Sequence, residues 1–237
     1  MPDISERKKL KFPQELAYLV AIVVLALGVS MSAAADFGMS MIAAPAYILS
    51  LRVEALSFGQ AEYVVQALMM VIMCLILRRM KPIYLFSFVT CLIYGLVLDA
   101  ERALIRPLNP TVVAPGAFPM PVRIALFVGS ILVTAFAVAL FFHSLFFPQV
   151  HDMFVALVSR RYKIPLTKFK LFYDIGALIV SAAMTLLLLG RIEGIGPGTV
   201  IIAFVNGPLI GLAGKLIDNA CEFTVGFPKL AALFETD

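Results

Sequence analysis

Charged side chains are scarce in this sequence, where Asp, Glu, Lys and Arg together make up 14% of the 237 residues. An ordinary soluble domain has about a quarter charged residues and about half apolar residues. Apolar residues here reach 62%, and the mean hydropathy is +0.99. A soluble fold of this length could not bury so much apolar surface. The composition therefore excludes an ordinary soluble domain and indicates a protein that is solvated by lipid.

The sequence also has few residues of the kinds that bind metals. Its three cysteines, Cys74, Cys91 and Cys221, are odd in number and lack the spacing of metal ligands. We interpret them as reduced, apolar side chains. The two histidines, His143 and His151, are separated and have no further ligands clustered near them. We therefore expect no metal site.

Motifs of common enzymes are missing as well. The glycine-rich run 194–198 is not followed by Gly-Lys-Ser/Thr, so it is not a P-loop. No Gly-x-Ser-x-Gly nucleophile motif occurs. The net charge of +4 comes from basic residues beside apolar runs, which is typical of topology determinants. We expect no enzymatic activity, no cofactor and no nucleic-acid partner.

Long apolar runs recur along the chain, and about 20 apolar residues cross the hydrocarbon core as a helix. The first run follows several basic residues, as in a signal peptide, but it is long and 32–35 is a weak cleavage signal. We expect it to remain as a span in an all-α, polytopic membrane bundle. The predicted spans are 15–35, 60–77, 83–99, 122–145, 170–190 and 199–217.

The distribution of basic residues predicts the orientation of these spans. With the N-terminus inside, 14 of the 19 Lys and Arg residues lie in cytoplasmic segments. Cytoplasmic loops carry an excess of basic residues in membrane proteins. Six spans return the chain to its starting side, so we expect both termini in the cytoplasm.

Two apolar stretches, 38–53 and 150–163, are too short to span the bilayer. Each is expected to form a re-entrant or interfacial helix. They follow the first and fourth spans, so each half has the order span, short helix, span, span. Three spans per half would invert the second half, and inverted repeats are common in transporters. Chance similarity between apolar segments is the alternative.

We treat residues 1–237 as one membrane domain. A cytoplasmic segment, 1–14, precedes the first half, 15–99, and an extracellular connector, 100–121, leads to the second half, 122–220. The connector is rich in proline, which predicts an ordered segment without regular structure. The cytoplasmic tail, 221–237, is expected to form a short amphipathic helix on the membrane surface.

Glu62 is the strongest candidate site residue, because an ionisable group in a span usually faces a cavity or a partner. Gln66 lies four residues later, on the same helical face. Gln60 and Tyr63 add further polar groups nearby. The cluster could bind a polar solute or a cation. The alternative is a helix start at the interface, where an acidic residue favours the positive end of the helix dipole.

Other carboxylates are weaker candidates. Asp174 is the inverted counterpart of Glu62 and could couple ions, although pairing with Lys170 is the alternative. Asp36 ends the first span and could couple ions or cap the following short helix. Asp99 ends the third span, where we expect an ion pair at the interface.

The segment that leads into the sixth span is the second candidate region. Gly196, Gly198 and Thr199 surround Pro197, and exposed amides at such a helix start could bind an anionic group. Asn206-Gly207-Pro208 is expected to interrupt the sixth span, as in transporters with discontinuous helices. A surface turn and a packing kink are the alternatives. Asn206 is included in the predicted solute site.

Several short motifs are distributed over residues 15–220. They are Asp36-Phe37-Gly38-Met39-Ser40 with Ala44-Pro45-Ala46, Ser57-Phe58-Gly59 with Ala61-Glu62-Tyr63, and Gly196-Pro197-Gly198-Thr199-Val200-Ile201 with Asn206-Gly207-Pro208. In these motifs the chain resembles the YczE/YyaS/YitT-like family of uncharacterised bacterial multi-pass membrane proteins. The resemblance implies a polytopic protein of the bacterial cytoplasmic (inner) membrane. It implies no activity and no catalytic residues.

We expect a transporter, or a transporter substrate-binding subunit, for a small polar or anionic solute. The alternative is a non-transporting scaffold or accessory protein, whose basic segment 160–170 and C-terminal tail bind a partner or anionic lipid. A polar cavity lined by Glu62 and the sixth span would favour transport. Glu62 facing the lipid headgroups would favour a scaffold. Either reading is compatible with a homo-oligomer or a partner membrane subunit.

Overall fold

The computed structural model describes residues 10–81, 84–144 and 149–225. Six of its helices are long and apolar enough to cross a membrane, which confirms the predicted all-α membrane bundle. These helices are α1 (Gln14–Ala35), α3 (Phe58–Leu77), α4 (Tyr84–Leu104), α5 (Met120–Phe141), α7 (Leu166–Met184) with its π-helical extension η3 (Thr185–Leu189), and α8 (Pro197–Ala220).

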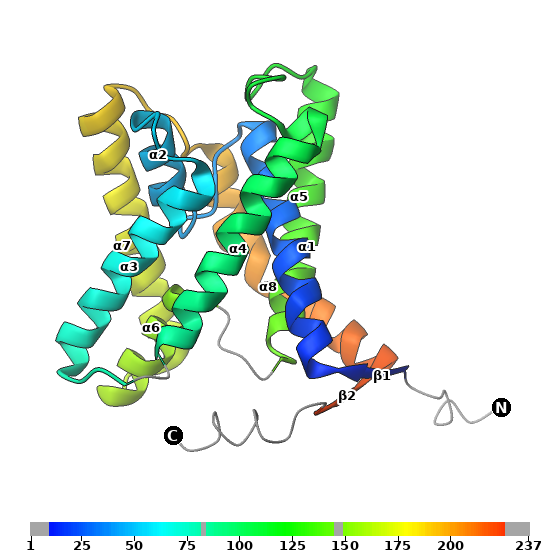
Figure 1. The fold of residues 1–237 in the computed structure, drawn as a ribbon, viewed down its shortest axis with the longest axis vertical. Coiled ribbons are helices and arrows are strands. Elements are labelled where there is room, and N and C mark those ends of the chain that lie inside the picture. Colours follow the sequence, from blue (N-terminus) through cyan, green and yellow to red (C-terminus); the bar gives the residue numbers. More distant parts are fainter. Residues whose placement is uncertain (1–9, 82–83, 145–148, 226–237) are drawn as a thin grey trace.

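The two predicted short helices are also present, as α2 (Ala44–Arg52) and α6 (Val150–Arg161). In Figure 1, α2 lies near one end of the bundle and α6 near the other. Strands β1 (Leu10–Pro13) and β2 (Cys221–Thr224) lie at the same end as α6. We call this end the terminal face and the opposite end the far face.

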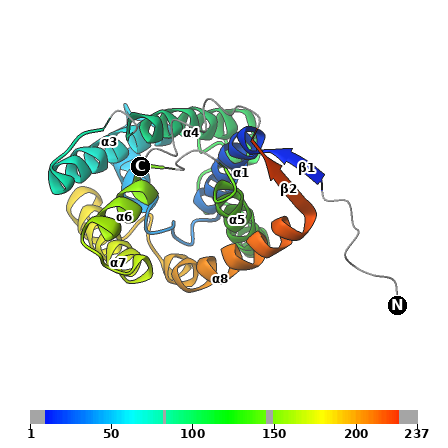
Figure 2. The ribbon, with the colours of Figure 1, turned by 90° about the horizontal axis from the view of Figure 1, so that it is seen from below.

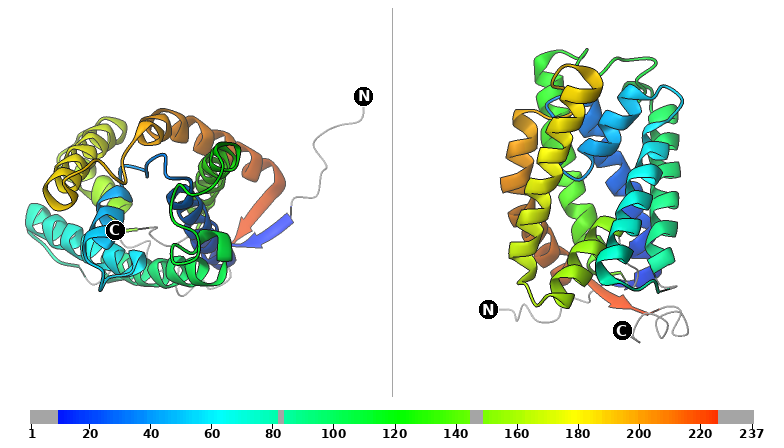
Figure 3. Two further views of the ribbon diagram at one scale, coloured as in Figure 1. Left: turned by 90° about the horizontal axis from the view of Figure 1, so that it is seen from above. Right: turned by 90° about the vertical axis from the view of Figure 1, so that its left-hand side faces the viewer.

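The strands join the two ends of the described chain. β1 and β2 pair in parallel, with Leu10 opposite Cys221 and Pro13 opposite Thr224 (Figures 1 and 3). The rings of Phe12 and Phe223 meet edge to face with centroids 6.1 Å apart. The expected helix from 221 onward is therefore wrong for its first four residues, because β1 offers them a strand partner. Residues 226–237 of that segment lie outside the described residues.

Several predictions about the ends and the continuity of these elements need correction. α4 continues to Leu104, and the connector contains a 3-10 turn, η2 (Arg106–Leu108), so it is not wholly irregular. α5 ends at Phe141, where the prediction extended to 145. α8 is continuous through Pro208, so the predicted interruption of the sixth span is wrong. A proline removes one backbone donor, and the remaining helical hydrogen bonds hold the helix together.

Small residues bring α1 and α5 close together. Ala17, Ala21 and Ala26 of α1 are fully buried. A Cβ at Gly28 would come within 2.5 Å of the Thr134 side chain of α5. Small side chains allow such close helix packing inside a membrane, where apolar contact with lipid competes equally. α1 and α5 therefore form a closely packed pair.

Glycines allow α3 and α4 to pack in close contact near the far face. Gly59 and Gly95 approach backbone to backbone, and the Tyr63 hydroxyl donates to the Leu92 carbonyl at 3.0 Å. Asp99 accepts a hydrogen bond from the Gly59 amide at 2.9 Å. Asp99 thus accepts a hydrogen bond from an amide at the start of α3. It takes part in none of the ion pairs found among the described residues, so the expected ion pair is wrong. Gln60 also belongs to this helix start, because its side chain accepts from the Ser57 amide in a capping box.

The corresponding pair in the second half, α7 and α8, is arranged differently. α7 packs mainly against α2 and α6, whereas α8 packs mainly against α5. Viewed from either end, the long helices form a ring in the order α1, α4, α3, α7, α8 and α5, which differs from their order along the chain (Figures 2 and 3). The interior of that ring is the place to look for a site.

Candidate functional site

The loop between α1 and α2 enters the bundle from the far face. Met39 in this loop is only 2% exposed, and its amide donates to the Gly194 carbonyl at 2.9 Å. The Gly198 amide donates to the Phe37 carbonyl at 2.8 Å. The loop and the start of α8 thus bind each other through their backbones.

These contacts occupy the amides that the sequence offered for an anionic group. The Gly198 amide is bound to Phe37, and the Gly196 amide donates to the Thr199 hydroxyl at 3.1 Å. Thr199 is 1% exposed. The structure places Gly196, Gly198 and Thr199 together, at the far-face contact and not on the central cavity described below.

Gly38 is at the closest point of this contact, and replacing it should be costly. Its φ is +108°, and a Cβ there would come within 2.5 Å of the Gly196 nitrogen. We expect Gly38→Ala to reduce the free energy of unfolding by about 2–3 kcal/mol, because strain and overpacking act together. Unfolding of the purified protein by denaturant measures this change.

Gly207→Ala is the matched control, since a Cβ at Gly207 meets open space and its φ lies outside the positive range. Alanine is the better helix former, so the control should be neutral or slightly stabilising. Equal stability of the two variants would contradict the close contact at Gly38.

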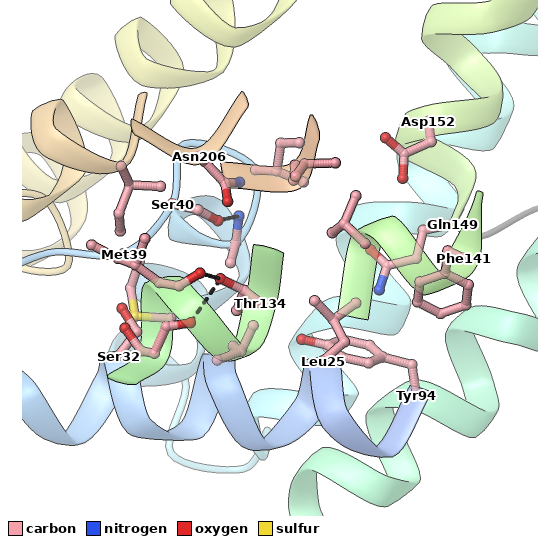
Figure 4. A pocket seen from close by; sticks show the side chains of 18 of the residues that line it. Leu25, Ser32, Met39, Ser40, Tyr94, Thr134, Phe141, Gln149, Asp152 and Asn206 are labelled. Atoms are coloured by element: carbon pink, nitrogen blue, oxygen red, sulfur yellow. Dashed lines mark hydrogen bonds between the residues drawn. The ribbon is translucent and has the colours of Figure 1, made fainter. Parts of the chain in front are cut away.

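A cavity of about 180 Å³ lies inside the ring of helices, between the two halves of the chain. Most of its wall is aliphatic or aromatic. Figure 4 shows Ser32, Ser40, Thr134 and Asn206 toward one end and Gln149 and Asp152 toward the other. The polar and charged residues of the lining are Ser32, Ser40, Glu62, Tyr94, Ser130, Thr134, Gln149, Asp152, Lys170 and Asn206.

Glu62 lines this cavity and is 3% exposed. The structure therefore excludes the alternative in which Glu62 faces the lipid headgroups. One of its carboxyl oxygens accepts a hydrogen bond from the Gln66 side chain at 3.1 Å. None of the ion pairs found among the described residues includes Glu62. An ionisable group in such a position is expensive and usually functional.

Gln66 connects Glu62 to the start of α6. It is fully buried, and its amide nitrogen also lies 3.4 Å from the Gln149 carbonyl oxygen. Its own carbonyl oxygen accepts from the Val150 amide at 3.2 Å. The first amides of a helix lack partners within the helix. Gln66 thus supplies one such partner to α6. It also donates a hydrogen bond to Glu62, although Gln66 itself does not line the cavity.

Asn206 extends from α8 to the same cavity (Figure 4). Its side-chain oxygen is buried and has no hydrogen-bond partner among the described residues. Such groups are rare in folded proteins and deserve an explanation. A solute with an N–H or O–H group would satisfy this oxygen. The structure therefore brings Glu62 and Asn206, two predicted site residues, to one cavity.

The charged end of the cavity includes residues that were not predicted as site residues. Asp152 at the start of α6 and Lys170 of α7 both line it. Lys170 pairs with Asp174 one turn along α7, at 3.7 Å. Burial raises the pKa of Asp152, and the charge of Lys170 partly offsets this effect. The predicted alternative for Asp174, pairing with Lys170, is therefore present.

His151 lies beside this charged end and should make stability depend on pH. It is 3% exposed, its Nδ1 bonds with the Tyr173 hydroxyl, and its Nε2 is buried without a partner among the described residues. Burial, with a contribution from the positive charge of Lys170, lowers the pKa of His151 from 6.5 to about 4. Between these values the unfolded chain binds a proton that the folded chain does not. Stability should therefore fall by roughly 1 kcal/mol per pH unit below about pH 6.5.

Comparison with His151→Gln isolates this effect. The raised pKa of Asp152 acts in the opposite direction, and it is present in both proteins. The difference in melting temperature between wild type and variant should shrink or reverse as the pH falls from 7 to 5. A constant difference over this range would contradict a buried, neutral His151.

The two other predicted residues lie outside the cavity. Tyr63 holds α4 through its bond to Leu92. Asp36 ends α1 in a left-handed conformation and pairs with Arg123 at 3.4 Å. Burial raises the pKa of Asp36, and Arg123 opposes this shift. Asp36 does not cap α2, whose preceding residue is Ala43.

Gln149, Asp152 and Lys170 were missed because they sit beside predicted loops and helix ends. The signal that could have found Gln149 and Asp152 is their position at the start of the short helix, which by the repeat faces the centre of the bundle. Ser32, Ser40 and Thr134 carry no comparable signal in a sequence rich in small residues.

Comparison with known proteins identifies a family without an assigned activity. No curated protein and no solved structure matches the chain. The resemblance to YczE/YyaS/YitT-like proteins thus stays a prediction. A family match covers residues 12–215, which include all six long helices except the end of α8. The chain belongs to the family described as "Family of unknown function (DUF6198)".

Proposed function

We propose that this protein is a transporter, or the solute-binding subunit of one, for a small polar solute that occupies the central cavity. The observation that supports this most strongly is Glu62. It is buried, lacks a cationic partner among the described residues, and lines a cavity that also receives Asn206 of α8. A membrane scaffold has no need for a costly carboxyl group in its interior.

The arrangement of the two halves supports an inverted repeat. Each half has the order long helix, short helix, long helix, long helix. In Figure 1, α1 runs from the terminal face to the far face and α5 runs back, while α2 and α6 lie at opposite ends. Transporters built from inverted repeats bind their solutes near the interface of the halves, which is where this cavity lies.

The contacts described above support a state that is closed at the far face. There the loop at Phe37–Met39 binds the start of α8, and Gly59 meets Gly95. Toward the terminal face, α7 and α8 diverge in Figure 1. We propose that the cavity opens to the terminal face, and that this face is the cytoplasmic side of a bacterial inner membrane, as the basic residues predict.

A solute screen followed by counterflow tests the proposal. Small polar metabolites are added to detergent-purified protein, because a ligand that binds the native state raises its melting temperature. Solutes that raise it are then tested for exchange in proteoliposomes. The wild type should exchange at least one of them, and Asn206→Phe, which fills the cavity, should not. Absence of any thermal shift and any exchange would reject transport.

The accessory role remains the second candidate because of one surface feature. Arg161, Lys163 and Lys168 are exposed together at the terminal face. Basic residues next to a membrane attract anionic lipid at about 1 kcal/mol each. If the protein binds anionic vesicle lipid or a partner through these residues while failing the transport test, the accessory role is correct.

A further inference from the structure

We infer that the solute is a short aliphatic amine with a hydrogen-bond donor at each end, such as an amino alcohol or a diamine. Its ammonium group would lie between Glu62 and Asp152, and its second donor would reach Asn206. This inference rests on the proposed function and specifies the chemistry of the same cavity.

The charged end of the cavity favours a cation. Glu62 and Asp152 both line the cavity, and neither takes part in an ion pair among the described residues. Glu62 is joined through Gln66 to Gln149, which lies toward the same end as Asp152 (Figure 4). The cation that lines the cavity beside them, Lys170, is paired with Asp174. Carboxyl groups therefore outnumber the ammonium group here. When both carboxyl groups are ionised, a bound cation would compensate their surplus negative charge, whereas a bound anion would increase it.

Glu62 also has unused capacity to accept hydrogen bonds. Among the described residues, its carboxyl group accepts one hydrogen bond, from the Gln66 side chain. An ionised carboxylate can accept about four hydrogen bonds in total. Aromatic residues lie on the wall nearby, where Tyr94, Phe141 and Phe142 line the cavity. Aromatic faces attract organic cations, and this adds to the preference for an amine.

The opposite end of the cavity presents acceptors. The Ser32 hydroxyl already donates to the Gly38 carbonyl at 3.4 Å, and the Thr134 hydroxyl donates to the Ser130 carbonyl at 2.7 Å. A hydroxyl has one proton, so both groups have only lone pairs left for a solute. The unpartnered Asn206 oxygen is a third acceptor. A solute with a hydroxyl or amino group at this end would match all three.

The middle of the cavity limits the length and polarity of the solute. Aliphatic side chains separate the two polar ends, among them Leu25, Val29, Ile202 and Ile210. The volume of about 180 Å³ equals roughly six water molecules at about 30 Å³ each. A chain of a few methylene groups fits this space and its apolar wall.

Three probes of similar size separate these features. 4-Aminobutan-1-ol has the cation and both donors, n-butylamine lacks the second donor, and 4-hydroxybutanoate replaces the cation by an anion. Binding to the full-length protein in detergent is measured by calorimetry, and uptake into proteoliposomes is measured by mass spectrometry. We expect 4-aminobutan-1-ol to bind at least about tenfold more tightly than either other probe, as loss of one buried polar contact predicts.

Variants test which residues bind the ammonium group of the solute and which bind its second donor. Glu62→Gln and Asp152→Asn should each weaken binding of the amino alcohol by about tenfold or more. Glu54→Gln makes the same change as Glu62→Gln on an exposed loop, and it should leave the binding affinity unchanged. Asn206→Leu should remove the advantage of the amino alcohol over n-butylamine. That ratio is measured within one variant, so a general loss of folded protein does not imitate it.

The outcomes distinguish a failure of the amine inference from a failure of the proposed transport function. Stronger binding of 4-hydroxybutanoate, equal binding of all three probes, or no binding of any of them would overturn the amine inference. If other solutes still exchange in the counterflow test, the transport function survives that result. If no solute exchanges there either, the transport function fails together with the inference.

Discussion

Replacing Gln66 by leucine is expected to reduce the free energy of unfolding by about 2–4 kcal/mol. The substitution keeps the side chain's approximate size but removes its hydrogen bonds to Glu62, Gln149 and the Val150 amide. Each buried polar group left without a partner costs about 1–3 kcal/mol. Gln66 is fully buried, so water does not replace the lost bonds. Unfolding of the purified protein by increasing SDS in mixed micelles measures the change.

Asn219→Leu provides the control for Gln66→Leu. It replaces another amide side chain by leucine, at an exposed position near the end of α8. Exposed substitutions usually change stability by less than about 0.5 kcal/mol. A Gln66→Leu variant as stable as the Asn219→Leu variant would show that Gln66 does not hold α6.

Replacing Gly59 by alanine should have an even larger effect. A Cβ at this position would collide with the Gly95 carbonyl oxygen and would lie 2.6 Å from the Asp99 carboxyl. Backbone atoms cannot rotate away as a flexible side chain can. Separating α3 from α4 would break the bond from the Gly59 amide to Asp99. We expect a loss of more than about 3 kcal/mol, the upper range for overpacking, and little folded protein on size-exclusion chromatography.

Gly176→Ala tests whether that loss is specific to the α3–α4 contact. A Cβ at Gly176, inside α7, would meet no atom within 4 Å. Alanine should stabilise the helix there by up to about 1 kcal/mol. If Gly59→Ala behaved like Gly176→Ala, the backbone contact between α3 and α4 would be wrong.

The helices were predictable from the sequence because crossing a bilayer requires a simple pattern of apolar residues. Each span must be about 20 apolar residues long, so hydropathy alone located the long helices and the short α2 and α6. The pairing of Glu62 with Gln66 was also predictable, since residues four apart share a helical face. The expectation that Glu62 and the sixth span border one cavity depended on the repeat. Both Glu62 and Asn206 do line it, although most of the cavity wall is apolar where a polar cavity was expected.

Features that depend on contacts between distant segments could not be predicted. The amides at Gly196 and Gly198 were available in the sequence, but Thr199 and the loop at Phe37 occupy them in the fold. Asp99 was expected in an ion pair and instead binds the start of α3. Local patterns do not show which helix end will lie beside which carboxyl group.

The charged end of the cavity illustrates the same limit. Asp152 and Lys170 lie on different helices and come together only when α6 packs against α7. In the sequence, Lys170 was interpreted as a determinant of orientation and as a possible ion-pair partner of Asp174. The surplus of carboxyl groups in the cavity, which changes the expected solute from polar or anionic to cationic, thus becomes visible only in the folded protein.

The most direct test of the central claim asks whether a solute protects the cavity. In a protein with its native cysteines replaced by serine, Ser40→Cys places a thiol on the cavity wall and Glu54→Cys places one on an exposed loop. The rate of alkylation by a small maleimide is measured with and without the solute that raises the melting temperature most. We predict at least tenfold slower alkylation of Ser40→Cys by saturating solute, and no change for Glu54→Cys. Equal rates at Ser40→Cys with and without that solute would contradict the cavity as its binding site.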